Sequence, residues 1–81
     1  MDKEQIISNY ITEYMLLKSD YIATEEALKT AIDYMSVREY KTDLITDETR
    51  MNIIENKLKK MGFDIKKYIE DQREKYKVKQ L

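Results

Sequence analysis

Apolar residues recur every three or four positions from residue 6 to residue 35, in a stretch without proline or glycine. Placed on a helix at about 100° per residue, most of them fall on one stripe. Two interleaved seven-residue repeats describe this stripe: Ile7, Tyr14, Tyr21, Leu28 and Met35 in one register, and Tyr10, Leu17, Thr24 and Ala31 in the other. The pattern predicts one long helix of coiled-coil character over about residues 3–40.

A break near Thr24 is the alternative interpretation of this first stretch. Threonine is a good N-cap, and Glu25 and Glu26 would then occupy a first turn, where the helix dipole favours negative charge. The stripe keeps its phase through Thr24, however, and this favours the unbroken helix.

Two further helices are predicted, over about residues 47–61 and 65–77. Thr46 is the expected N-cap of the first, with Asp47 in its first turn. Gly62 suits the left-handed position after its last turn, and Asp64 can cap the next helix. Because the apolar residues stay on one face across Gly62, this glycine either ends the second helix or only kinks it.

The predicted fold class is all-α: a single helical domain over residues 1–81, arranged as a long hairpin or a small three- or four-helix bundle. A chain of 81 residues has a thin core and commonly needs a disulfide, a metal or a second copy. The sequence contains no cysteine and no histidine. We therefore expect dimerisation to complete the fold.

Several function classes are disfavoured by composition. Without histidine or cysteine, the chain lacks the usual general base, the thiolate nucleophile and the commonest transition-metal ligands. Its single glycine cannot form a nucleotide-binding loop. We expect no enzymatic activity, no metal site and no cofactor. The opening "MDKEQ" does not resemble a signal peptide, and no apolar run approaches the ~18–20 residues of a membrane span, so a cytoplasmic location is expected.

Apolar residues outside the main stripe are the best candidates for a partner interface, because a two-helix hairpin would leave several of them exposed. The cover could come from a second copy, from another protein or from a third helix of the same chain. The leading hypothesis is a protein–protein interaction module, a regulator, inhibitor or adaptor of the kind that phages and mobile elements use. The candidate interface residues are Ile11, Met15, Leu16, Ile22, Tyr34 and Tyr40.

Charge is distributed unevenly along the chain. Residues 1–56 hold six basic and twelve acidic side chains, a balance of −6, whereas residues 57–81 hold nine and four, a balance of +5. Nucleic-acid binding by the basic part is therefore a second hypothesis. A third is a bacteriocin-immunity-like bundle, which the chain resembles in being short, lysine-rich and helical. The candidate nucleic-acid contacts are Lys59, Lys60, Lys66, Lys67 and Arg73.

Overall fold

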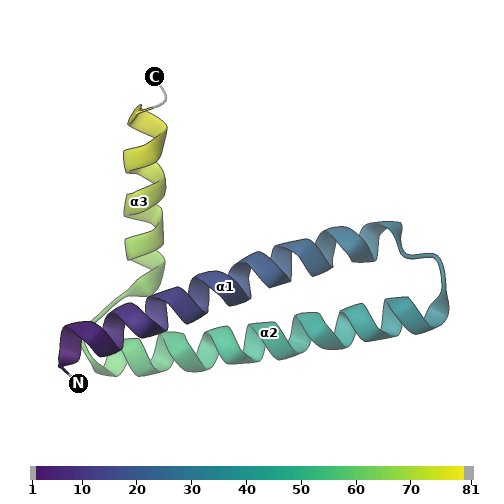
Figure 1. Cartoon of the computed structure of the whole chain (residues 1–81), viewed down its shortest axis with the longest axis horizontal. Coiled ribbons are helices and arrows are strands. Elements are labelled where there is room, and N and C mark those ends of the chain that lie inside the picture. The colour runs from purple at the N-terminus through teal and green to yellow at the C-terminus, as the bar shows by residue number, and fades with distance from the viewer. Residues whose placement is uncertain (1, 80–81) are drawn as a thin grey trace.

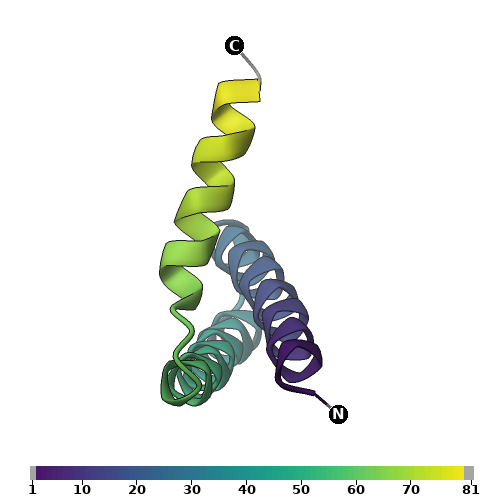
Figure 2. The ribbon, with the colours of Figure 1, turned by 90° about the vertical axis from the view of Figure 1, so that its left-hand side faces the viewer.

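Three helices make up the fold, and the residues that the structure describes contain no strand. The computed structural model describes the backbone of residues 2–79 and the side chains of residues 2–75. The helices are α1 (Lys3–Thr30), α2 (Tyr34–Lys60) and α3 (Ile65–Lys79). α1 and α2 lie side by side as an antiparallel hairpin, and α3 leaves one end of it at a steep angle (Figures 1 and 2). The all-α prediction is confirmed.

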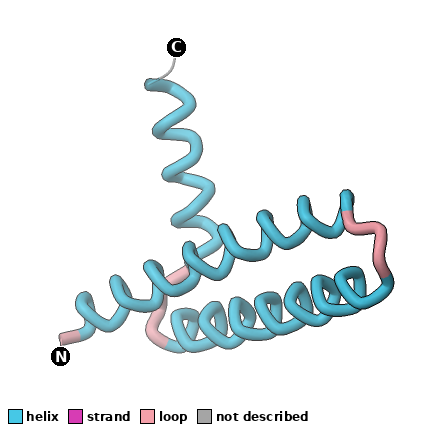
Figure 3. Tube along the Cα trace, turned by 45° about the vertical axis from the view of Figure 1, so that its right-hand side comes forward, coloured by secondary structure: helices cyan, strands magenta, loops and turns pink. Residues whose placement is uncertain are grey.

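The first helix is unbroken at Thr24, as its phase indicated, but it ends at Thr30 and not near residue 40. A short turn follows (Figure 3), and Asp33 caps α2 by accepting a hydrogen bond from the backbone N–H of Ser36 at 2.9 Å. That bond holds the pKa of the Asp33 carboxyl below its usual range. An aspartate is among the strongest N-caps, so it starts a new helix although the apolar repeat runs on through it.

The predicted start of the second helix at about residue 47, with Thr46 as its N-cap, is also wrong. α2 begins thirteen residues earlier, at Tyr34, and Thr46 lies in its interior. The hydroxyl of Thr46 donates to the carbonyl of Thr42 at 3.0 Å, a bond that is compatible with a continuous helix. Asp47, predicted to lie in the first turn of a helix, instead lies in the interior of α2, and its side chain is buried.

Gly62 ends α2 and does not merely kink it. Its φ of 80° is left-handed, and the N–H groups of Phe63 and Gly62 donate to the carbonyls of Leu58 and Lys59 at 2.9 and 3.0 Å. These two bonds form a Schellman motif. Asp64 then caps α3 through the N–H of Lys67 at 3.2 Å, so α3 starts at Ile65 as predicted and runs to Lys79, two residues past the expected end.

The core lies at the end of the hairpin from which α3 leaves. It consists of four buried side chains from the three helices: Tyr14, Ile54, Leu58 and Ile65. The molecule is extended, with a radius of gyration of 15.5 Å, whereas a compact chain of this length would have about 12 Å. Its surface of 6,666 Å² is about 1,500 Å² more than a compact monomer of its mass would expose.

Candidate interaction surfaces

A groove of about 480 Å³ runs between α1 and α3. On the α1 side it is lined by Ile11, Met15 and Ile22, which lie on one face of the helix about one and two turns apart. Tyr68 and Ile69 line it from α3. Met15 and Ile22 are exposed, because α3 points away from the hairpin and does not pack along it. The groove is therefore an apolar surface without a cover in the isolated chain.

Two basic side chains, Lys18 of α1 and Arg73 of α3, also line the groove. Neither forms an ion pair with any described residue. Both contribute to a neighbouring hollow as well, together with Lys66 and Glu70. The apolar walls are thus edged by two positive charges that form no ion pair with the described residues.

A chain of polar contacts joins the three helices beside the core and holds α3 in place. The Tyr14 hydroxyl donates to Glu55 at 2.8 Å, and the other oxygen of Glu55 lies 3.6 Å from the Lys66 ammonium. Burial, assisted by the bond to Glu55 and by its negative charge, raises the pKa of Tyr14 to about 12. The ring of Phe63 packs against that of Tyr68 at 5.6 Å. These contacts and the buried Ile65 set the angle at which α3 leaves.

The turn at the opposite end of the hairpin exposes three large apolar side chains. We call Ile32, Tyr34 and Met35 the hairpin tip; their exposed fractions are 99%, 75% and 70%. Asp33 lies between Ile32 and Tyr34 in the sequence. Such a cluster of exposed apolar side chains is uncommon in a monomer unless it contacts something.

The predicted interface residues are divided by the structure among four places. Ile11, Met15 and Ile22 lie in the groove, and Tyr34 lies at the hairpin tip. Leu16 is 67% exposed but lies about 100° around α1 from Met15, outside the groove. Tyr40 is half-buried on the face of α2 that turns to α1. Pattern reasoning missed the α3 wall and the other tip residues, because both depend on how the helices are placed in space.

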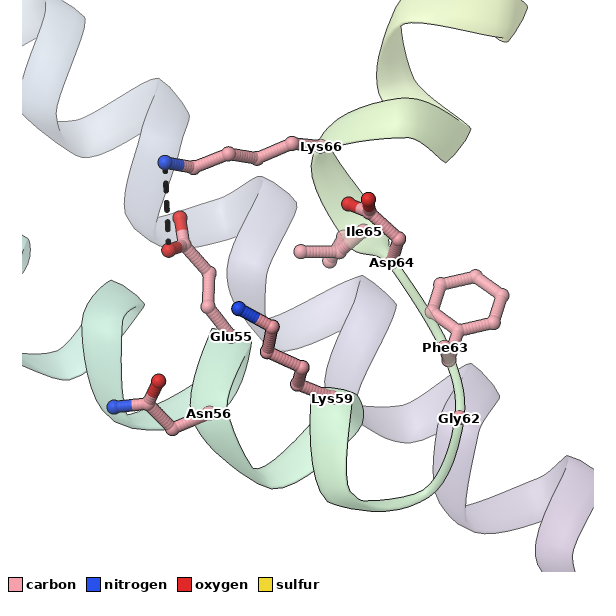
Figure 4. A pocket seen from close by; sticks show the side chains of 8 residues that line it. All are labelled: Glu55, Asn56, Lys59, Gly62, Phe63, Asp64, Ile65 and Lys66. Atoms are coloured by element: carbon pink, nitrogen blue, oxygen red, sulfur yellow. Dashed lines mark ion pairs between the residues drawn. The ribbon is translucent and has the colours of Figure 1, made fainter.

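The five predicted nucleic-acid contacts are all exposed. Lys59 and Lys66 border a hollow of about 340 Å³ at the junction of α2 and α3, and Figure 4 shows both side chains near Glu55, which pairs with Lys66. Lys60 and Lys67 do not line this hollow, and Arg73 lies in the groove between α1 and α3. Lys66 shares the neighbouring hollow with Arg73, whereas Lys60 and Lys67 line none of these hollows, so the five basic residues do not all lie at one site.

Asp47 is an unusual member of the hairpin interior. It is 7% exposed, and no described residue donates a hydrogen bond to its Oδ2. A hydrogen bond with Asp20 of α1, together with burial and the charges of Asp20 and Asp43, raises the pKa of Asp47 to about 6, against the opposing effect of Arg50. An acid in this position is better accommodated protonated than ionised.

Within the described residues, no group of three or more acidic, histidine or cysteine side chains is placed to hold a metal ion. Nor does any helix of this part combine the length and the apolar character that crossing a bilayer requires. No protein-family model, no curated protein and no solved structure matches the chain. Its function is therefore inferred from its residues and their geometry.

Proposed function

We propose that this chain is a small, non-enzymatic protein–protein interaction module that acts as a regulator, inhibitor or adaptor and associates with itself. The observation that carries this proposal is the apolar groove between α1 and α3, which is exposed in the isolated chain. The hydrophobic effect favours covering such a surface, at roughly 25 cal/mol for each Å² of apolar area removed from water.

The amount of exposed surface agrees with this function. One side of a standard protein–protein interface buries about 800 Å². The excess over a compact monomer of this mass, about 1,500 Å², is large enough for one or two such contacts. Binding partners would thus supply the cover that a longer chain obtains from its own additional helices.

Nucleic-acid binding is less well supported, because only some of the basic side chains share a hollow and acidic residues lie among them. Lys66 pairs with Glu55, and Glu70 and Asp71 lie between the lysines and Arg73. An electrophoretic shift assay with duplex and single-stranded probes at several salt concentrations tests this alternative. Tight binding that weakens steeply with salt would contradict the interaction function proposed above.

Two neighbouring substitutions test the interaction function directly. Met15→Glu places a charge in the groove, whereas Leu16→Glu makes the same kind of change at a more exposed position outside it. We expect Met15→Glu to reduce self-association in sedimentation equilibrium, and to reduce recovery of bound proteins in a pull-down, at least tenfold. Leu16→Glu should leave both close to wild type. Equal behaviour of all three chains would refute a role for the groove.

A further inference from the structure

Two surfaces of this chain complement each other, although they lie at different ends of the hairpin. The groove between α1 and α3 is a concave apolar surface edged by Lys18 and Arg73. The hairpin tip is a convex apolar surface around Asp33. At 1.5 Å per residue, Met15 and the end of α1 at Thr30 are about 22 Å apart, so the tip of a chain cannot reach its own groove.

We propose that the hairpin tip of one copy inserts into the α1–α3 groove of a second copy. This inference rests on the proposed interaction function and names the occupant of the groove. Ile32, Tyr34 and Met35 would be covered by Met15 and Ile22 of α1 and by the apolar side chains of α3.

Charge favours this pairing. Between residues 25 and 39 the chain carries Glu25, Glu26, Asp33 and Glu39 against Lys29 and Arg38, a balance of −2. Lys29 is already paired with Glu26 at 3.1 Å. The carboxylate of Asp33 is held ionised near neutral pH by its bond to Ser36. The groove of the second copy presents Lys18 and Arg73, which have no acidic partner among the described residues.

The positive charges of Lys18 and Arg73 also disfavour a different occupant of the groove, helix α3 from a second copy. α3 carries Lys66, Lys67, Arg73 and Lys75 against Glu70, Asp71 and Glu74 over its described side chains, a positive balance. Placing it there would bring like charges close to Lys18 and Arg73, which costs free energy.

The exposed area also agrees with a contact between unlike surfaces. In a symmetric dimer each chain uses one patch, whereas in a head-to-tail contact each chain inside the assembly uses two. Two patches of about 800 Å² each come close to the excess of about 1,500 Å². Contacts of this kind close into a ring or continue as a filament, depending on the rotation between successive copies.

Complementation between two variants tests the proposal. Ile32→Asp blocks the tip at a fully exposed position, and Met15→Glu blocks the groove at another exposed position, so neither change disturbs the core. We expect wild type to form species that grow with concentration in sedimentation velocity, and each variant alone to be monomeric. An equimolar mixture should give a one-to-one heterodimer that grows no further, because its remaining tip and groove are both blocked.

Each other result has a defined meaning. A wild type that associates while the mixture stays monomeric overturns the proposal, since two unlike surfaces must complement. If the Ile32→Asp and Met15→Glu variants each still associate alone, the contact lies elsewhere and the proposal is also overturned. If wild type is monomeric but binds foreign proteins in a manner that Met15→Glu abolishes, the head-to-tail contact and self-association are refuted, and only binding to other proteins through the groove stands.

Reversing the charge of Arg73 at the edge of the groove tests the charge complementarity between the groove and the hairpin tip. Arg73→Glu in the chain that supplies the groove should weaken the one-to-one complex about two- to fivefold, the range expected for a partly exposed charge pair. Lys67→Glu reverses a charge on the same helix outside the groove and should leave the affinity unchanged. A tighter complex with Arg73→Glu would contradict the assigned orientation.

Discussion

The two ends of the hairpin differ in how well they are packed. At the junction with α3, three helices meet, and Tyr14, Ile54, Leu58 and Ile65 are buried together. Between residues 20 and 50 only two helices are present, and of the described side chains there only Asp47 is buried. A helix pair covers a single seam and leaves most of each helix in water, whereas a third helix turns the seam into a core. One end of this molecule is thus stabilised by a core of three helices, whereas the other is a two-helix pair without such a core.

The largest difference between the two ends should appear on truncation of a leucine. Leu58 is fully buried in the core, and we expect Leu58→Ala to lower the free energy of unfolding by about 3 kcal/mol. Leu28 is half-buried, so water already reaches its surroundings. We expect Leu28→Ala to lower the free energy of unfolding by only about 1 kcal/mol. Urea unfolding at one protein concentration measures both, and equal losses would contradict the difference in packing between the ends.

Acid should stabilise the two-helix end. The pKa of Asp47 is raised to about 6 in the folded chain, above the ~3.9 of an unfolded aspartate. The folded state therefore binds more protons than the unfolded state between these values, and the stability from Asp47 is present below pH ~4 and lost as the pH rises through 6. Lowering the pH from 7.5 to 5 should add about 1 kcal/mol, because only the part of the pKa difference that lies between pH 5 and pH 6 is titrated over this range.

Asp47→Asn is the matched control for this pH dependence. The amide keeps the size of the side chain, carries no charge and can donate a hydrogen bond to Asp20. We expect the variant to be more stable than wild type at pH 7.5. Its stability should rise much less than that of wild type when the pH is lowered to 5, as thermal unfolding would show. Measurements stay above pH 4.5, because the lowered pKa of Asp33 makes the α2 cap lose stability in more acidic solution. A wild type as stable at pH 7.5 as at pH 5 would rule out the burial cost assigned to Asp47.

Local chemistry explains which parts of this fold could be predicted from sequence. The left-handed end of α2 at Gly62 was one of the two alternatives that the sequence left open, and the cap at Asp64 was predicted, because both depend on a few neighbouring residues. The cap at Asp33 carried the same kind of local signal, but the apolar repeat continued through it by coincidence. Thr46 followed by Asp47 resembled a helix N-terminus, and only the packing of α2 on α1 shows that Asp47 is buried.

The candidate surfaces could be predicted only in part, for the same reason. Ile11, Met15 and Ile22 lie outside the main stripe at about 100° per residue, so the exposure of Met15 and Ile22 follows from helix geometry. The wall that Tyr68 and Ile69 add depends on the angle of α3, which Ile65 and the contacts of Glu55 set across long sequence separations. The exposed tip depends on where α1 ends. The period of the apolar residues determines neither the angle of α3 nor the residue at which α1 ends.

The two connections of the chain give the smallest expected difference. The turn between α1 and α2 needs no left-handed residue, with φ of −72° at Ala31 and −96° at Asp33. The connection to α3 requires one at Gly62, where φ is 80°. A Cβ added at Gly62 would meet no atom within 4 Å, so Gly62→Ala tests backbone strain alone. We expect a loss of about 1 kcal/mol, and a smaller loss for Gly62→Asn, because asparagine enters the left-handed region more readily. Urea unfolding compares the two variants. If alanine proved as stable as glycine, the left-handed turn would not be the conformation that joins α3 to the hairpin.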